Sequence, residues 1–268
     1  MVWTIKLSRN MRVAADAARE VGEYMVAEWH KLSAKDIREK APGDHVTRVD
    51  RECEEMIKKV IVREFPGDAM LGEESGGQIP KEGPLWLIDP LDGTRNYIHH
   101  VPFFSVSIGF ALDGTMQMGV IYDPLRKEMF CCKRDEGVWL NDSPIRVSEV
   151  ADISQAIVAT ECSGRMRDVM PGFLDRFGSI ASRAGAVRAG GSAALGLAYV
   201  ACGRYDAFWH PSLFPWDMAA GALMIEAAGG MVSAGDGGTW RIDSGSVFAS
   251  NFDLHGVLQG MIKGGTGR

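Results

Sequence analysis

The stretch Leu85-Trp86-Leu87-Ile88-Asp89-Pro90-Leu91-Asp92-Gly93-Thr94 decides how this chain folds. It begins as an apolar run, typical of a buried strand that ends at Asp89, and a second carboxylate follows at Asp92. Pro90 stiffens the turn between them, and Gly93 permits a close backbone approach. The amides of Gly93, Thr94 and Arg95 are expected to open a short helix, which is a ready anion site.

Two further carboxylates, Glu73 and Glu74, follow the preceding predicted strand. Clustered carboxylates repel one another unless a cation joins them, and hard oxygen ligands suit Mg²⁺ better than zinc. The backbone carbonyl of Leu91 could complete the shell. Taken singly, Asp-Pro and Asp-Gly are common turn pairs and Glu73-Glu74 could be a solvated loop. Taken together, these groups favour a metal-assisted phosphoryl-transfer site, where metals neutralise phosphate and lower the pKa of a bound water.

The sequence before residue 150 predicts two helices and then a sheet. One apolar stripe, spaced by three or four residues, runs from Ala14 to Trp29, and a second helix covers residues 47–65, ended by Pro66-Gly67. Short runs with strand character and short connections follow, which favours an antiparallel sheet. These runs are residues 69–71, 85–88, 105–111, 117–122, 128–132 and 137–140.

After residue 150 the pattern alternates between strands and helices, which is typical of an α/β half. Strands are expected at residues 156–160, 186–188, 206–209 and 247–249, and helices at 170–177, 192–202, 217–228 and 254–262. We therefore predict an α+β half, residues 1–150, and an α/β half, residues 151–268, joined in one compact unit without repeats or a long linker.

Composition limits the class of protein. Hydrophobic residues make up 46% and charged residues 24% of the 268 residues, and the net charge is −6, which makes nucleic acid an unlikely partner. The five cysteines are odd in number and show no C-x-x-C spacing, which argues against a disulfide framework or a zinc cluster. The chain has neither the apolar core of a signal peptide nor a membrane-spanning run, so we expect a cytoplasmic protein with no membrane partner.

Two motifs give the chain a resemblance to a known family. One is the W-x-I-D-P-x-D-G-T stretch, residues 86–94, with G-E-E-S at residues 72–75. The other is W-D-x-A-A-G at residues 216–221 followed by E-A-A-G-G at residues 226–230. Over nearly its whole length the chain resembles the inositol monophosphatase family of lithium-sensitive, Mg²⁺-dependent phosphatases. That family also includes fructose-1,6-bisphosphatases and bisphosphate nucleotidases.

The resemblance implies a layered α-β-α-β-α sandwich, two to three Mg²⁺ ions and a set of residue roles. Glu73, Asp89 and the Leu91 carbonyl would bind one ion, and Asp89, Asp92 and Asp217 the second. Thr94 would orient the attacking water with Asp50, which lies in a V-T-x-x-D element, and Glu74 would support that water. The amides of Gly93 and Thr94 would hold the phosphate. Ala193, His210 and Asp217 would contact the substrate. No covalent phospho-enzyme is implied.

Substrate choice is where the sequence departs from inositol-specific members. Such members carry a glutamate seven residues before the second-motif aspartate, but this chain has His210. His210 either hydrogen-bonds a different polyol or packs against Trp209. Arg165, Arg167 and Arg188 are candidates for a second phosphate or are plain surface arginines, the latter favoured for Arg167. Lys40 either reaches the metal site or is solvated.

The sequence thus favours hydrolysis of a phosphate monoester on a small polyol or sugar by a metal-activated water, in a homodimer. Alternatives of the same fold are a fructose-1,6-bisphosphatase, a histidinol-phosphate phosphatase or a nucleotide-bisphosphate phosphatase. An alternative of another class is a regulatory binding protein associated with RNA-handling machinery.

Overall fold

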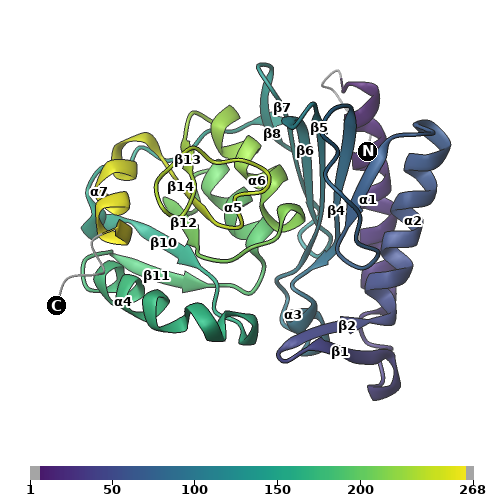
Figure 1. Ribbon diagram of the computed structural model, residues 1–268, viewed down its shortest axis with the longest axis horizontal. Coiled ribbons are helices and arrows are strands. Elements are labelled where there is room, and N and C mark those ends of the chain that lie inside the picture. Colours follow the sequence, from purple (N-terminus) through teal and green to yellow (C-terminus); the bar gives the residue numbers. More distant parts are fainter. Residues whose placement is uncertain (1–6, 264–268) are drawn as a thin grey trace.

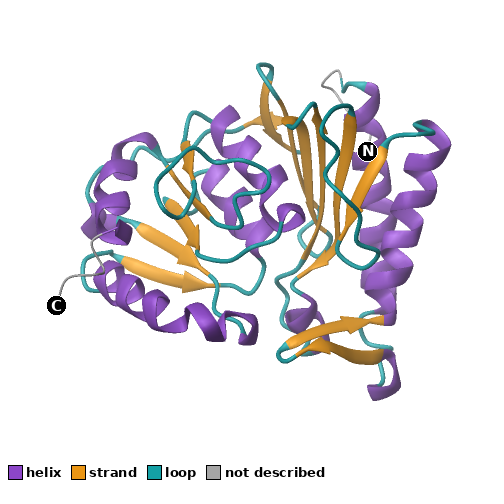
Figure 2. Cartoon of the chain, viewed as in Figure 1, coloured by secondary structure: helices purple, strands orange, loops and turns teal. Residues whose placement is uncertain are grey.

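The computed structural model describes residues 7–263, which form five layers in the order α-β-α-β-α (Figures 1 and 2). The predicted layered sandwich is confirmed. Residues 1–6, on which part of the expected absence of a signal peptide rests, lie outside the described residues. The layers are α1 (Arg9–Glu28) with α2 (Arg48–Glu64), a seven-stranded sheet, α5 (Ala193–Ala201) with α6 (Pro215–Ala227), a five-stranded sheet, and α4 (Met170–Ala181) with α7 (Phe252–Lys263).

The seven-stranded sheet has its strands in sequence order. They are β3 (Ala69–Gly72), β4 (Pro84–Asp92), β5 (Ser105–Leu112), β6 (Thr115–Asp123), β7 (Glu128–Lys133), β8 (Gly137–Leu140) and β9 (Ser143–Pro144). All neighbours pair antiparallel except β3 and β4, which are parallel. The prediction of a wholly antiparallel sheet is therefore wrong at this edge. A parallel pair requires the chain to cross back before β4, and residues 73–83 make that return.

Both faces of this sheet are buried. Two adjacent cysteines show this burial on both faces. Cys131 packs into the core beneath α1 and α2, whereas Cys132 packs into the core beneath α5 and α6. Trp86 lies in the first core, and its neighbours Leu85 and Leu87 lie in the second. This alternation explains why β4 reads as a continuous apolar run rather than as a polar–apolar alternation.

The five-stranded sheet has the order β11-β10-β12-β14-β13. The strands are β10 (Ile157–Thr160), β11 (Ala186–Ala189), β12 (Ala207–His210), β13 (Met231–Ser233) and β14 (Val247–Ser250). The first three strands are parallel, as expected of an α/β half, but β14 pairs antiparallel with both β12 and β13. The sheet is therefore mixed, and β13 is a strand that the sequence pattern did not indicate.

Close backbone contacts fasten the middle layer to the larger sheet. A Cβ on Gly119 of β6 would lie 2.9 Å from the Cα of Ala220 in α6. A Cβ on Gly221 would lie 2.4 Å from the Cβ of Leu197 in α5. Each distance is far below van der Waals contact, so glycine is required at both positions for α6 to sit between α5 and the sheet.

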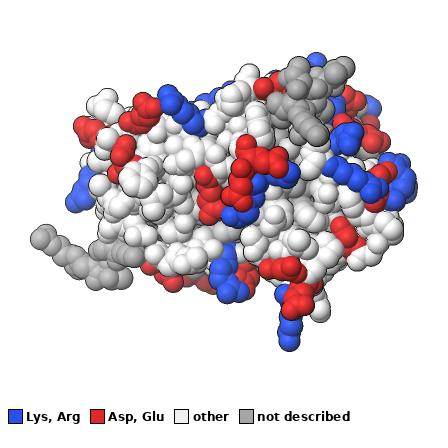
Figure 3. All heavy atoms as spheres, turned by 90° about the horizontal axis from the view of Figure 1, so that it is seen from above, with Lys and Arg blue, Asp and Glu red and all other residues white. Residues whose placement is uncertain are grey.

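A hairpin that the sequence did not predict projects from the α1–α2 layer (Figure 1). It consists of β1 (Ile37–Ala41) and β2 (Asp44–Thr47). Shorter elements complete the chain: α3 (Thr94–Ile98) and the 3₁₀ helices η1 (Ala34–Asp36), η2 (Ile153–Gln155) and η3 (Gly164–Val169). None of the helices within residues 7–263 has the length and apolarity that a bilayer crossing requires. On the face drawn in Figure 3, basic and acidic side chains are interspersed.

Candidate functional site

A pocket of about 410 Å³ lies where the two halves meet, and nearly all the predicted site residues line it. The first half contributes Glu73, Asp89, Leu91, Asp92, Gly93 and Thr94, and the second half contributes Ala193, His210 and Asp217. Asp50 lies fully buried behind Thr94 rather than on the pocket surface. Glu74 is the exception, because its side chain faces a different hollow outside α2.

The two aspartates of β4 reach the pocket through an irregularity in the strand. Pairing of β4 with β5 shifts between Asp89 and Asp92, so the strand continues to Asp92 instead of ending at Asp89 as predicted. The Asp89 carboxylate accepts a hydrogen bond from the Leu91 N–H at 3.0 Å. The Asp92 carboxylate accepts bonds from the Ser192 hydroxyl and, at 2.7 Å, from the Ala194 N–H. Asp92 is thus fixed by the N-terminus of α5, from the other half of the chain.

Asp217 occupies the first turn of α6, which begins at Pro215. One carboxylate oxygen accepts the Phe214 N–H at 2.9 Å, a helix-capping contact, while the side chain also lines the pocket. The capping interpretation and the ligand interpretation of this residue are therefore compatible. Negative charge is favoured at this end of a helix, which partly offsets the burial of the carboxylate.

Lys40 links the β1–β2 hairpin to the acidic turn after β3. Its ammonium lies 3.1 Å from Glu73 and 2.7 Å from Glu74, so Lys40 reaches the acidic cluster rather than solvent. Burial lowers the pKa of Lys40, but the charges and hydrogen bonds of the two glutamates outweigh it and leave the pKa raised. Lys40 is the cation that partly neutralises this turn in the structure described.

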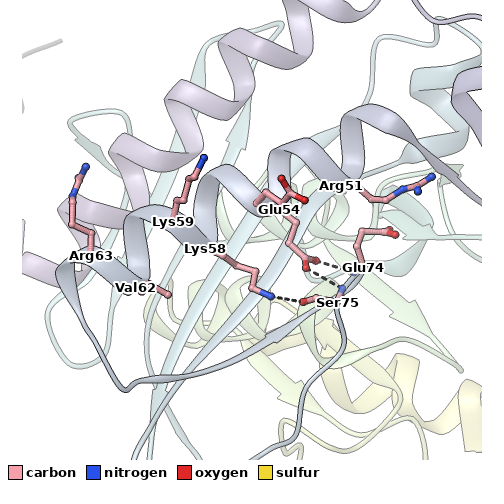
Figure 4. A pocket seen from close by; sticks show the side chains of 9 residues that line it. Arg51, Glu54, Lys58, Lys59, Val62, Arg63, Glu74 and Ser75 are labelled. Carbon is pink, nitrogen blue, oxygen red and sulfur yellow. Dashed lines mark hydrogen bonds between the residues drawn. The ribbon is translucent and has the colours of Figure 1, made fainter.

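The same turn is clamped onto α2 from its other side (Figure 4). Glu54 is only 3% exposed, and its carboxylate accepts the N–H groups of Glu74 at 2.8 Å and Ser75 at 3.0 Å. Lys58 donates to the Ser75 hydroxyl at 2.8 Å. A Cβ on Gly72 would lie 2.6 Å from a Glu54 oxygen, so only glycine lets the carboxylate approach this closely. Around this clamp lies the outer hollow of about 700 Å³ that Glu74 faces.

The electrostatics of the pocket show four acids in too small a space. Burial raises the pKa of Asp89, and the charges of Glu73, Asp92 and Asp217 raise it further. Burial and the neighbouring acids likewise raise the pKa of Asp92 and of Asp217, although the Ser192 and Ala194 donors oppose the rise at Asp92. Groups perturbed in this way either hold protons or await a cation.

The donor set fits a hard divalent cation. All four side chains are carboxylates, with the Leu91 carbonyl beside them in the pocket lining, and oxygen ligands of this kind suit Mg²⁺. No group of three histidine, cysteine or acidic side chains within residues 7–263 is already arranged as a formed metal site. The fit therefore rests on the ligand chemistry and on the mutual repulsion of the acids, which a cation would relieve.

Thr94 and Asp50 form a hydrogen-bonded pair beside these acids. The Thr94 hydroxyl lies 2.8 Å from Asp50 and 3.1 Å from the Leu91 carbonyl. The other Asp50 oxygen accepts the Thr47 N–H at 2.9 Å and the Thr47 hydroxyl at 2.5 Å, which closes the N-terminal cap of α2. Burial raises the pKa of Asp50 to about 7, with a smaller contribution from Glu73. The predicted V-T-x-x-D element is thus both a helix cap and a partner of Thr94.

Glycines let the two halves meet above this pair. Gly93 has φ +96°, and a Cβ there would lie 3.1 Å from the Gly191 carbonyl. Gly191 has φ +87°, and a Cβ there would lie 2.7 Å from the Asn96 side chain. The Asn96 amide donates to the Gly190 carbonyl at 2.8 Å, which joins α3 to the loop before α5.

The wall of the pocket from the second half contains residues that sequence analysis left open or missed. His210 lines the pocket, while Trp209, on the opposite face of β12, stacks on Phe173 at 5.0 Å. Arg165 lines the pocket, but Arg167 and Arg188 do not. Glu161 was missed. It follows β10, and its carboxylate accepts the N–H groups of Gly190 and Gly191.

Two signals could have found the missed residues. Glu161 comes directly after a parallel strand, where ligand-binding groups of α/β sheets collect. Glu54 lies four residues after Asp50, so the two acids share one face of α2. Ser192 was also missed, and its hydroxyl both binds Asp92 and caps α5.

The chain is similar to known proteins over nearly its whole length. The model of the inositol monophosphatase family matches residues 6–264. "Nus factor SuhB" of Pseudomonas aeruginosa is 40% identical over 247 residues, covering 90% of this chain and 91% of that protein. "Inositol-1-monophosphatase" of Mesorhizobium japonicum is 35% identical over 254 residues, covering 94% and 96% of the two chains.

Solved structures show the same similarity in three dimensions. The extragenic suppressor protein suhB from Bartonella henselae has a TM-score of 0.91 and 34% identity, covering 96% of this chain and 99% of its own. The inositol monophosphatase from Anabaena has a TM-score of 0.85 and 35% identity, with 94% of both chains covered.

Proposed function

The chain belongs to the inositol monophosphatase family, and we propose that it hydrolyses phosphate monoesters of small polyols or sugars with Mg²⁺. The observation that carries this proposal is the convergence of four buried carboxylates on one pocket beside the Thr94–Asp50 pair. Metal-dependent hydrolases of phosphate esters that use no covalent intermediate combine a cation site with a positioned water.

The residues that would hold the ions come from three elements. Glu73, Asp89 and the Leu91 carbonyl would hold one Mg²⁺, Asp89, Asp92 and Asp217 a second, and a third ion could lie near Glu73. When bound, such ions neutralise the phosphate and lower the pKa of water. Because Lys40 is paired with Glu73, we expect its ammonium to move away from Glu73 as the ions bind.

Thr94 and Asp50 would orient the attacking water. The Thr94 hydroxyl donates a hydrogen bond to Asp50, which leaves its oxygen lone pairs free to accept a hydrogen bond from water. Asp50 is itself held by Thr47, so the threonine oxygen has a fixed direction. Glu74 would act on this network indirectly, through Lys40 and the turn that carries Glu73.

The substrate would lie between the two halves. The amides of Gly93 and Thr94 would hold the phosphate, since both residues line the pocket at the start of α3, directly after the two aspartates of β4. Ala193, at the start of α5, and Asp217 would contact the alcohol part of the substrate. His210 would lie beyond them.

The test is phosphate release from a substrate panel with and without Mg²⁺. The panel holds inositol 1-phosphate, fructose 1,6-bisphosphate, histidinol phosphate, galactose 1-phosphate and adenosine 3′,5′-bisphosphate. Release should require Mg²⁺ and should fall at least about 100-fold in Asp92→Asn, because a lost ligand costs more than a lost supporting contact. Absence of release from every substrate by correctly folded protein would refute the proposal.

A second candidate function follows from the names of several relatives. Because proteins called "Nus factor SuhB" are up to 40% identical to this chain, we also propose a binding role with RNA-handling machinery. The net charge of −6 gives RNA itself little electrostatic attraction, so a protein component is the favoured partner. An RNA-binding assay with a salt titration distinguishes direct RNA binding from binding to a protein component, since direct RNA contact would weaken steeply with salt.

Family resemblance supports three further proposals: a homodimer, a cytoplasmic location and inhibition by lithium. Light scattering, cell fractionation and the panel assay repeated with LiCl test them in turn.

A further inference from the structure

The wall of the pocket that faces the acids presents hydrogen-bond donors. We call Arg165, in η3, and His210, in β12, the donor wall. Both line the pocket, and both come from the half of the chain that supplies only Asp217 to the acidic cluster.

The tautomer of His210 is fixed by its own loop. Its Nδ1 accepts the Ser212 N–H at 3.1 Å, so in the neutral ring the proton must be on Nε2. Burial lowers the pKa of His210 to about 4, and the Arg165 charge lowers it further in the same direction. The ring is therefore neutral and offers the pocket an N–H. A glutamate at this position offers the opposite, an acceptor for a substrate hydroxyl.

Arg165 has donors without acceptors. Its Nε lies 3.6 Å from the Asp44 carboxylate, and its guanidinium lies over the Phe214 ring at 5.7 Å. Among residues 7–263 no acceptor lies within hydrogen-bond distance of its terminal nitrogens. The guanidinium is thus supported on one side by an ion pair and an aromatic face, with its planar fork unused. Such a fork matches a carboxylate or a phosphate.

The nearby acid does not consume this charge. Glu161 also lines the pocket, but the N–H groups of Gly190 and Gly191 already bind its carboxylate. Asp44 is the single carboxylate within 4.0 Å of Arg165 in the described part of the chain. The acids of the pocket act on Arg165 electrostatically, Asp217 most strongly, but none of them binds its terminal nitrogens. A neutral polyol would therefore leave the Arg165 fork without an anionic hydrogen-bond partner.

We propose that the alcohol part of the substrate carries a second anionic group, a phosphate or a carboxylate, held by the Arg165 guanidinium and the His210 Nε2–H. This inference rests on the proposed function, because the first phosphate is taken to lie at the acidic cluster. A pocket of about 410 Å³ has the size of known small-molecule sites.

The experiment compares kcat/KM within two matched pairs of substrates. In the first pair, 2-phosphoglycerate carries a carboxylate where glycerol 2-phosphate carries a hydroxymethyl group. In the second, fructose 1,6-bisphosphate carries a phosphate that fructose 1-phosphate lacks. At least one pair should favour the member with the second anionic group by about 10- to 100-fold, the effect of one charge-assisted hydrogen bond. The pair with the larger ratio identifies the anion.

Substitutions test whether Arg165 and His210 cause the preference for the second anionic group. Arg165→Met keeps an unbranched stem beside Phe214 but removes the guanidinium, so the ratio within the favoured pair should fall to about 1. Arg165→Lys should keep part of the ratio, and His210→Glu should invert it. Arg167→Met, two residues along the same 3₁₀ helix and outside the pocket lining, is the matched control and should behave as wild type.

Equal kcat/KM within both pairs, or a ratio that survives Arg165→Met, would overturn the proposal. If no substrate is hydrolysed, the proposed function fails first, and binding then decides this inference separately. Calorimetric titration of Thr94→Ala with the same four compounds and Mg²⁺ should show the same preference without turnover. Failure of that variant to distinguish the members of either pair would also reject the donor wall.

Discussion

The two walls of the pocket differ in how completely their side chains are engaged. On the acidic wall, Asp89, Asp92 and Asp217 each accept at least one hydrogen bond from neighbouring backbone or hydroxyl groups, and so does Asp50, which lies behind this wall. On the donor wall, the Arg165 fork and the His210 Nε2–H have no acceptor among the described residues. One wall is fixed before any ligand arrives, whereas the other has donors in reserve.

This difference indicates that the acidic wall carries out the reaction and that the donor wall selects the substrate. Groups that must hold ions and water in one geometry benefit from rigid support. Groups that distinguish substrates gain only if the substrate supplies what they lack, since an unpaired buried donor is costly. The comparison predicts that substitutions on the acidic side alter the reaction itself, while those on the donor wall alter its preference.

Breaking the support of the acidic wall should have the largest effect. Glu54→Ala removes the acceptor for Glu74 and Ser75, so the turn that carries Glu73 loses its attachment to α2. We expect Mg²⁺ affinity to fall about 10- to 100-fold, with kcat at saturating Mg²⁺ largely retained. Titration calorimetry with Mg²⁺ measures the affinity. Glu54→Gln, which keeps one acceptor, should restore part of the affinity. Glu55→Ala, on the exposed side of α2, is the control, and equal losses in both alanine variants would contradict the idea.

An effect of intermediate size is expected on the pH dependence of stability, to which the acidic side and Glu161 contribute separately. Burial raises the pKa of Asp50 to about 7 and that of Glu161 to about 8, well above the unfolded values of about 4. Between these limits the folded state binds more protons than the unfolded state, so the free energy of unfolding falls as pH rises. Without metal, the melting temperature should be at least about 2–4 °C lower at pH 8 than at pH 5.5, which corresponds to ~1 kcal/mol.

Mg²⁺ should remove the part of this slope that comes from the acidic wall and leave the part from Glu161. Glu161→Gln should then flatten the slope of the Mg²⁺-bound protein. Differential scanning calorimetry at several pH values checks both statements, and a melting temperature that rises from pH 5.5 to pH 8 would show the assignment to be wrong.

The smallest effect is expected from the ion pair between Asp44 and Arg165. Asp44→Asn removes the carboxylate 3.6 Å from Arg165, which releases the guanidinium for an anionic substrate. Because a partly exposed ion pair is worth at most about 1 kcal/mol, kcat/KM for the substrate with the second anionic group should rise less than about fivefold. Mg²⁺ affinity should stay unchanged. A fall in kcat/KM would mean that Asp44 holds Arg165 in its active position.

What the sequence predicted well was local. The apolar run before Asp89, the helix from Thr47 and the alternation after residue 150 each depend on neighbouring residues, and the structure contains all of them. The acidic residues of the site were found because they lie within two short motifs. The division of the chain near residue 150 stays a prediction.

What the sequence did not show depends on distant contacts or on polar, exposed segments. The β1–β2 hairpin is short and polar: β1 is exposed along most of its length, and β2 buries only Val46 and Thr47, so there is no apolar period to detect. The parallel pairing of β3 with β4 requires residues 73–83 to cross back, and Glu54 holds the start of that segment on α2. Glu161 is a lone acid in sequence, and only the folding of the loop before α5 gives it partners.

The bond between Asp92 and Ala194 also has a consequence in time. Its two residues are 102 positions apart in the chain. At a synthesis rate of about 5–20 residues per second, β4 leaves the ribosome about 5–20 s before the amide that fixes its aspartate exists. During that interval Asp92 lacks its Ser192 and Ala194 partners, whereas Asp89 already has the Leu91 N–H, so the finished pocket is a late product of translation.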